Sequence, residues 1–271
     1  MKQTPESSPP SKRQTDFLKA HALRCRRVTF VKVALFFLFL LQWELTTRFH
    51  LVNSFVFSSP SRIFLTFCSM VKNGDLFLHI GVTLLETLIS FALVTLVTLF
   101  AASILWYFTF AADVAEPYLV VLNSLPKSAL APLFIVWFGT GFKTIVIAGI
   151  SVAIFGSILQ LYQYFLHTDP ELYKLIFTLG GSRRHVLRYI LLPGSKPVIL
   201  SGMKVNIGLC LVGVVIGEFL AARRGLGYLI IYGSQVFKLD WVLLAILILC
   251  LIAMGMYKAI DVFTTKNTGV K

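Results

Sequence analysis

Residues able to do chemistry are few in this chain, and their spacing does not form a catalytic or metal site. The four cysteines and five histidines are scattered, without a C-x-x-C, Cys/His or H-E-x-x-H pattern. Cys210 and Cys250 lie in apolar runs, where cysteine packs as a small hydrophobic residue. The nearest approach to a phosphate-binding loop, Gly139 to Thr144, has the wrong spacing for G-x-x-x-x-G-K-[ST]. We therefore expect no catalytic residue, no metal and no cofactor or nucleotide bound by this chain.

Ionisable and polar residues inside apolar runs are the better functional candidates. Lys204 and Glu218 lie near opposite ends of one such run. A charge at the bilayer centre costs about 2.5 to 3.5 kcal/mol on insertion scales, so it tends to face a cavity. Lys204 is close to the end of its run and can instead extend to the membrane surface. Glu218 either makes a contact at the outer side of the membrane or lies at a solvated helix end. Asn206 either packs between helices or lines a path for the solute.

The elements that position these residues follow from the composition. Hydrophobic residues make up 57% of the chain and charged residues 14%, whereas a soluble domain has about 25% charged residues. The net charge of +13 would suggest nucleic acid only on the basic face of a soluble domain. Here Lys and Arg fall mainly between apolar runs, which indicates a membrane protein that binds no nucleic acid.

Six runs approach the roughly 20 apolar residues that cross a bilayer as a helix. The first resembles a signal peptide, but no small-x-small cleavage site follows, so we interpret it as a retained anchor. The second contains a single charge, Glu86. The third is short and holds Pro126 and Pro132, so it is either a crossing or a re-entrant element. The predicted spans cover about residues 28–45, 80–108, 125–140, 144–166, 197–220 and 240–258.

Positive charge predicts the orientation, because Lys and Arg accumulate on the cytoplasmic side. With the N-terminus inside, sixteen of the 25 Lys and Arg residues fall in inner segments and seven in outer ones. We expect a disordered cytoplasmic tail over residues 1–25, a transmembrane domain over 26–260 and a cytoplasmic tail over 261–271. Outside, Ser59-Pro60-Ser61 favours the start of a short amphipathic helix over residues 63–71.

The most informative segment is the basic loop of residues 167–196, between the fourth and fifth spans. Asp169-Pro170 favours the start of a first helix, and Gly180-Gly181 favours its end. Ser182 can cap a second helix, which we expect Pro193 to end. The first helix has an apolar face that suits a partner or the protein's own spans, formed by Leu172, Leu175, Ile176 and Leu179. The second carries basic residues suited to anionic headgroups or an acidic partner: Arg183, Arg184 and Arg188.

This loop resembles part of a known signature. Gly180, nine residues, Ile190, one residue and Leu192-Pro193 match the G-x9-I-x-L-P half of the "EAA" loop of ABC importer permeases. Further segments, in the right order, are similar to the nitrate/sulfonate/taurine branch of that family, so the resemblance covers about residues 59–260. These segments are Ser59-Pro60-Ser61, Ala129 to Leu133, Trp137 to Gly141 and Gly225 to Ile230.

The resemblance implies an all-α, type I ABC importer permease fold in a bacterial inner membrane, working as a homodimer. A separate cytoplasmic ATPase dimer would hydrolyse ATP, and a periplasmic substrate-binding protein would deliver the solute. That solute would be a small organic anion or oxyanion such as a sulfonate, taurine or nitrate, or alternatively a thiamine precursor or another small metabolite. The residues expected to form the coupling loop against the ATPase are Glu171, Lys174, Leu175, Gly180, Gly181, Ser182, Ile190, Leu192 and Pro193.

One departure bears on this interface. Where the family has Glu-Ala-Ala, this chain has Lys174-Leu175-Ile176, so the charge complementarity must differ, and Glu171, one turn earlier, is a candidate substitute. Three rival hypotheses are weaker. A secondary carrier predicts inverted repeats, a membrane enzyme predicts His/Asp/Glu clusters within the spans, and a scaffold leaves the loop signature unexplained. The sequence shows neither the repeats nor the clusters.

Overall fold

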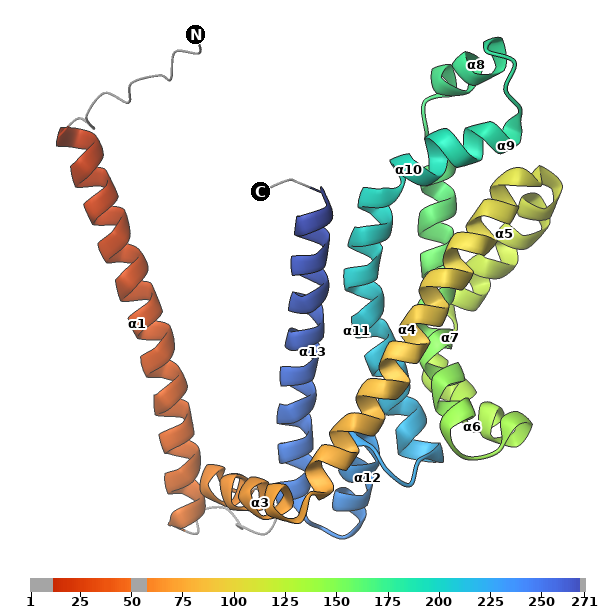
Figure 1. Ribbon diagram of the computed structural model, residues 1–271. Helices are drawn as coiled ribbons and strands as arrows, with labels where there is room; N and C mark the ends of the chain where they lie inside the picture. Colours follow the sequence, from red (N-terminus) through yellow and green to blue (C-terminus); the bar gives the residue numbers. More distant parts are fainter. Residues whose placement is uncertain (1–11, 50–57, 269–271) are drawn as a thin grey trace. The chain divides into compact units, whose positions relative to one another are not determined.

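The computed structural model describes residues 12–49 and 58–268, which form helices and connecting loops without a β-strand (Figure 1). Helices are expected where the chain meets lipid, because an α-helix satisfies its own backbone N–H and C=O groups. Five described helices are long and apolar enough to cross a membrane, and a bent pair of helices would bring the number to six. This confirms the predicted all-α fold with about six spans.

The N-terminal unit, residues 1–64, contains the long helix α1 (Lys12–Arg48). Its apolar part is residues 26–48, and large side chains such as Phe30 and Phe37 are exposed on it, as suits a helix surrounded by lipid. The helix begins within the segment expected to be a disordered tail; residues 1–11 of that tail lie outside the described part. Near its end, the Glu44 carboxylate accepts a hydrogen bond of 2.8 Å from the Ser61 hydroxyl.

Ser61 lies in the first turn of the amphipathic helix α3 (Pro60–Asn73), which the sequence predicted.

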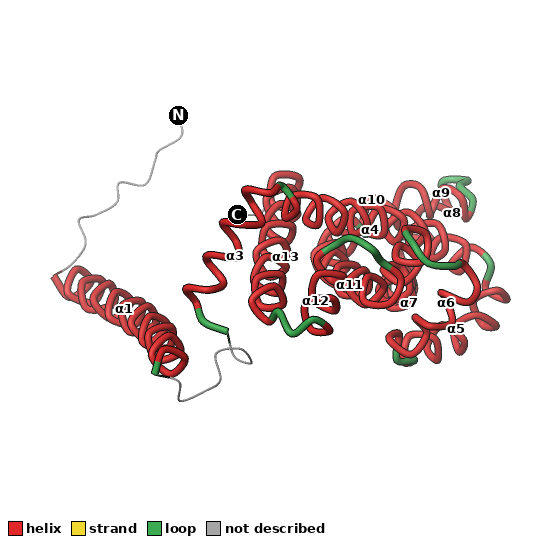
Figure 2. Tube along the Cα trace, turned by 90° about the horizontal axis from the view of Figure 1, so that it is seen from below, coloured by secondary structure: helices red, strands yellow, loops and turns green. Residues whose placement is uncertain are grey.

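The second unit, residues 65–271, is built around α11 (Lys196–Ala221), which contacts α4 (Asp75–Tyr107), α7 (Phe142–Leu166), α12 (Leu226–Gln235) and α13 (Leu239–Thr268) (Figures 1 and 2). The start of α4 lies beside the end of α11, so these two helices are antiparallel. The buried side chains that join α4, α7 and α11 at mid-length are small: Val94, Ala153 and Cys210.

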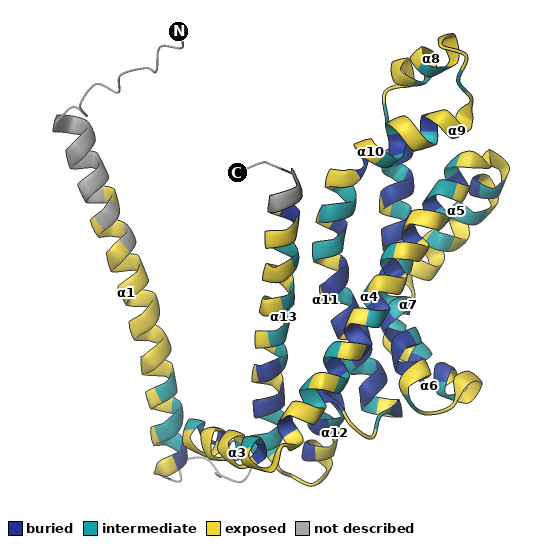
Figure 3. Ribbon diagram, in the orientation of Figure 1, coloured by how far each residue is buried: buried dark blue, intermediate teal, exposed yellow. Residues whose placement is uncertain are grey.

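Glycines bring α7 and α11 into close contact. A Cβ atom on Gly213 would lie 2.7 Å from the Ala148 carbonyl oxygen, and one on Gly217 would lie 3.0 Å from the Ile145 Cα. Small residues at an interface let helix backbones approach closely in lipid, where dispersion forces replace the hydrophobic effect. Buried residues accordingly gather along α7 and the middle of α11 (Figure 3).

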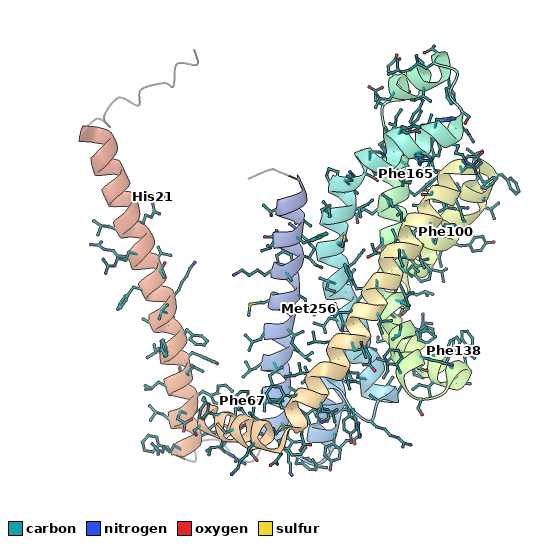
Figure 4. The ribbon with its side chains drawn as sticks, in the orientation of Figure 1. His21, Phe67, Phe100, Phe138, Phe165 and Met256 are labelled. Atoms are coloured by element: carbon teal, nitrogen blue, oxygen red, sulfur yellow. The ribbon has the colours of Figure 1, made fainter. Side chains whose placement is uncertain are left out.

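The third predicted span, about residues 125–140, corresponds to the second helix of a bent pair. Residues 109–138 form α5 (Thr109–Ser124) and α6 (Lys127–Phe138), which are bent by 102° at a short break. Pro126 has no backbone N–H to continue the helix through that break, and the Lys127 ammonium donates to the carbonyl groups of Leu122 and Asn123 at the end of α5. The pair therefore begins well before residue 125 and ends at Phe138, which Figure 4 labels. Helix α4 ends at Tyr107.

Enlarging Gly213 tests the α7–α11 contact. We expect Gly213→Val to lower the free energy of unfolding by about 1 to 3 kcal/mol, because overpacking a close contact forces the backbones apart. Thermal unfolding of the purified protein in detergent measures the change. Gly208→Ala on the same helix is the matched control, since a Cβ there meets nothing within 4 Å. Equal stability for the two variants would contradict the interpretation.

Candidate functional site

The loop between α7 and α11 begins with α8 (Pro170–Thr178), whose ends are those the sequence predicted. The Asp169 carboxylate accepts from the Glu171 N–H at 2.9 Å, and Pro170 occupies the first turn. Gly180 then takes a positive φ of 79°, a backbone conformation that favours glycine. The adjacent N–H of Gly181 donates to the Ile176 carbonyl at 2.8 Å and closes the helix.

The second part of the loop comprises α9 (Arg183–Val186), a π-helical turn η1 (Leu187–Leu191) and α10 (Leu192–Gly194). Ser182 caps it as predicted, in a reciprocal arrangement with His185. The prediction that Pro193 ends this helix is wrong, because helical backbone continues through Gly194. The π-helical turn ends two residues before Pro193, and the Leu192 N–H bonds to the Leu187 carbonyl. Pro193, which has no N–H, therefore follows a point where the regular helical register is already shifted.

One face of α8 is fastened to the membrane domain. The Tyr173 hydroxyl donates to the Phe165 carbonyl at 2.8 Å, and its ring makes an edge contact with Trp106 of α4. Burial raises the pKa of the Tyr173 hydroxyl, which therefore stays a hydrogen-bond donor at neutral pH. Ile176 packs on the cluster that includes the fully buried Phe165, which Figure 4 labels at this end of α7.

The part of the apolar face next to Ile176 is uncovered. Leu172, Leu175 and Leu179 are 41%, 55% and 76% exposed, although leucines at helical spacing ordinarily pack. Lys174 and Glu171 form an ion pair of 2.8 Å on the exposed surface. The two candidate charges of this helix therefore neutralise each other.

The base of the loop is the part that packs most tightly. Val186 and Leu191 are fully buried against Phe165, with Ile190 and Leu192 packed around them. The Arg183 guanidinium donates to the Tyr107 carbonyl at 2.9 Å and lies 6.0 Å from the Trp106 ring centroid. The end of α4 and the end of α7 are thus both connected to the loop.

The polar residues proposed from the sequence for a solute path are not brought together. The Lys204 ammonium forms an ion pair of 2.5 Å with Asp261 on α13. Asn206 lies buried within the helix bundle, where its amide oxygen accepts from the Ser157 hydroxyl of α7 at 2.7 Å. Glu218 belongs to a third and separate cluster at the far end of α11.

Glu218 is fully buried and holds the start of α12 against α4. Its carboxylate accepts from the Thr83 hydroxyl at 2.7 Å and from the Gly227 N–H, and the same Thr83 hydroxyl accepts from the Leu226 N–H at 2.8 Å. A Cβ at Gly225 would lie only 2.3 Å from the carboxylate oxygen. The Gly225-Leu226-Gly227 segment is therefore a cradle for a carboxylate at a helix N-terminus.

Sequence reasoning missed the partner of Glu218. The buried Glu86 carboxyl lies close enough to Glu218 to interact with it electrostatically, and one of its oxygens has no hydrogen-bond partner among the described residues. The signal was present in the sequence, since Glu86 is the one charge in its apolar run. The sequence alone does not show how far α4 and α11 are shifted along each other, and this register places the third turn of α4 beside the end of α11.

These features define a polytopic membrane protein with a partly uncovered helical loop at one end of its helix bundle. In the described residues, no group of three or more His, Cys, Asp or Glu is placed to hold a metal. Residues 95–265 match the family described as binding-protein-dependent transport system inner membrane component, and the chain belongs to that family.

Relatives and solved structures agree with this membership. The chain is 27% identical to a formylaminopyrimidine transport permease of Halalkalibacterium halodurans, over 72% of this chain and 77% of the relative. It is 24% identical to a putative aliphatic sulfonates transport permease of Bacillus subtilis, over 78% and 76%. Its fold is similar to a chain of the MetNI methionine ABC transporter in an inward-facing conformation, with a TM-score of 0.60, 16% identity and coverage of 71% of this chain and 97% of that chain.

The protein is thus a multi-pass inner-membrane permease subunit of an ABC importer, and not an enzyme. Its family works with a separate ATPase subunit and a substrate-binding protein.

Removing the carboxylate of Glu218 tests the buried cluster. We expect Glu218→Leu to lower the free energy of unfolding by about 2 to 5 kcal/mol, because the Gly227 N–H and the Thr83 hydroxyl lose their acceptor in a buried site. Thermal unfolding in detergent measures the loss. Glu171→Leu, at an exposed position on α8, is the control and should change stability by less than about 0.5 kcal/mol. A stable Glu218→Leu protein would rule out the structural role.

Proposed function

We propose that α8 is the coupling helix of this permease and docks in a groove of the partner ATPase. The observation that carries the proposal is that the apolar residues of this helix are only partly covered. Tyr173 and Ile176 fasten the helix to the membrane domain, whereas the neighbouring Leu172, Leu175 and Leu179 stay exposed. A short helix that exposes apolar side chains on a loop is typical of a surface that another protein covers.

The docking depends on apolar contact rather than on a family-type glutamate. Because Lys174 and Glu171 already pair on the helix surface, they present little net charge to the ATPase. An exposed pair of this kind contributes at most about 1 kcal/mol, while burying one leucine contributes about 1.5 to 3 kcal/mol. Both residues would lie at the edge of the interface, with the leucines at its centre.

The proposed cycle uses the connections at the base of the loop. Two permease copies would each receive one ATPase subunit, with both termini and the loop in the cytoplasm, embedded in membrane lipid. Closure of the ATPase dimer on ATP would displace α8. Gly180 and Gly181 would act as the hinge, and Ser182, Ile190, Leu192 and Pro193 would carry the movement through the loop base into α11. A periplasmic binding protein would supply the solute at the opposite face.

Two solute classes follow from the branch of the family. The sequence resemblance favours a small anion of the sulfonate, taurine or nitrate type, and one relative is named for aliphatic sulfonates. The second candidate is an uncharged heterocycle of the thiamine-precursor type, since another relative is named for formylaminopyrimidine. Lys204, Asn206 and Glu218 were proposed from the sequence to line the path; Lys204 and Glu218 are already engaged with protein partners.

A charge on the exposed face of α8 tests the docking. We expect Leu175→Asp to reduce co-purification of the ATPase subunit in mild detergent at least tenfold, because a leucine side chain that the interface would bury is replaced by a carboxylate that must be desolvated. Quantitative immunoblotting of both subunits measures it. Thr178→Asp, on the same helix but off the leucine face, is the matched control. Normal ATPase capture by Leu175→Asp would contradict the assignment.

The hinge is tested separately. We expect Gly180→Val to abolish ATP-driven uptake while membrane insertion persists, because a β-branched residue is strained at a φ of 79°. Gly180→Asn is the matched control and should retain much of the uptake, since asparagine tolerates the left-handed region. Uptake by membrane vesicles and the amount of inserted protein are compared. Full activity of the valine variant would rule out Gly180 as the hinge.

A further inference from the structure

A cavity lined by apolar residues and by several hydrogen-bonding side chains lies between α4, α7 and α11, away from both the loop and the Glu218 cluster. Its volume is about 50 Å³. Three different helices contribute hydrogen-bonding side chains to it, which is the usual composition of a site for a small molecule. These side chains are Thr95, Thr98, Ser157, Gln160 and Asn206.

The Thr98 hydroxyl is the sign that something binds there. Thr98 is more than nine-tenths buried, and its oxygen has no hydrogen-bond partner among the described residues. An unsatisfied buried hydroxyl is costly and uncommon. It lines the same cavity as Asn206, whose amide oxygen already accepts from the Ser157 hydroxyl. Thr98 and the amide nitrogen of Asn206 are therefore left to face a molecule in the cavity.

No residue that lines the cavity carries a charge. The two ionisable side chains within the apolar run of α11 are held elsewhere: Lys204 by Asp261, and Glu218 by Thr83 and the α12 backbone. An anion that entered the cavity would lose its hydration without meeting a cation, which is strongly unfavourable. An uncharged group that donates and accepts hydrogen bonds would exchange its water bonds for bonds to hydroxyl and amide groups.

We propose that this cavity contacts the transported solute and that the solute is uncharged, with hydrogen-bond donors and acceptors along one edge. The inference rests on the proposed importer function and chooses between its two solute classes. A cavity of this volume holds a few water molecules, so the edge of a flat heterocycle replaces those waters as the solute passes. The alcohol and amide groups select for that edge and against a fixed negative charge.

Uptake measured with two probes tests the proposal. The full-length permease, assembled with its ATPase and binding protein in membrane vesicles, is supplied with radiolabelled formylaminopyrimidine or taurine. We expect ATP-dependent uptake of the pyrimidine, and we expect Thr98→Val and Asn206→Leu each to reduce it about tenfold. Thr98→Val keeps the side-chain shape and removes an unsatisfied hydroxyl, so thermal stability should stay level or rise.

The controls separate failure of this inference from failure of the proposed function. Ser201→Ala changes an exposed residue of α11 that bonds only to its own helix, and it should leave uptake unchanged. Three results would overturn the inference: uptake of taurine but not of the pyrimidine, uptake of neither probe, or normal pyrimidine uptake by both cavity variants. The third result would mean that the cavity holds only structural water. Loss of ATPase co-purification from the unaltered chain would instead overturn the proposed function.

Discussion

The close contact between α7 and α11 is the constraint on which the rest of the bundle depends. Gly213 and Gly217 remove the side chains that would hold the two backbones apart. Because lipid supplies no hydrophobic force between helices, contact area and small residues must provide the attachment. Once these helices are joined, α4 packs over their mid-length through Val94, and the loop that connects them is fixed at one end of the bundle. The same contact places Glu218 beside Thr83 at the other end.

The two ionisable side chains within the apolar run of α11 are bonded to protein partners. Glu218 is surrounded by donors from α4 and α12, and Lys204 has a carboxylate from α13. These groups hold helices together, and this structural role is sufficient to explain why they lie within the membrane domain. The cavity beside Thr98 differs, since its hydrogen-bonding capacity is greater than its protein partners use. A transport path needs such spare capacity, because groups that are fully bonded to the protein have nothing to offer a passing solute.

The sequence predicted most of the architecture because membrane helices are specified by composition. The spans, the amphipathic α3 and the caps at Asp169 and Ser182 depend on local chemistry, and the structure contains them. The break between α5 and α6 was harder to predict, since apolar character continues on both sides of it. The helical path through Pro193 depends on a π-helical turn that leaves no mark in residue type. The Glu86–Glu218 contact needed a register between distant helices, which a single sequence does not contain.

The ion pair between α11 and α13 has a consequence for biosynthesis. Lys204 and Asp261 are separated by 57 residues, so at about 5 to 20 residues per second the lysine is added to the chain roughly 3 to 11 seconds before its partner. During that interval α11 carries an uncompensated ammonium, whose long side chain can reach the headgroup region. The helix enters the bilayer with a charge that only α13 neutralises. The fold at this position is therefore complete only after α13 has been synthesised.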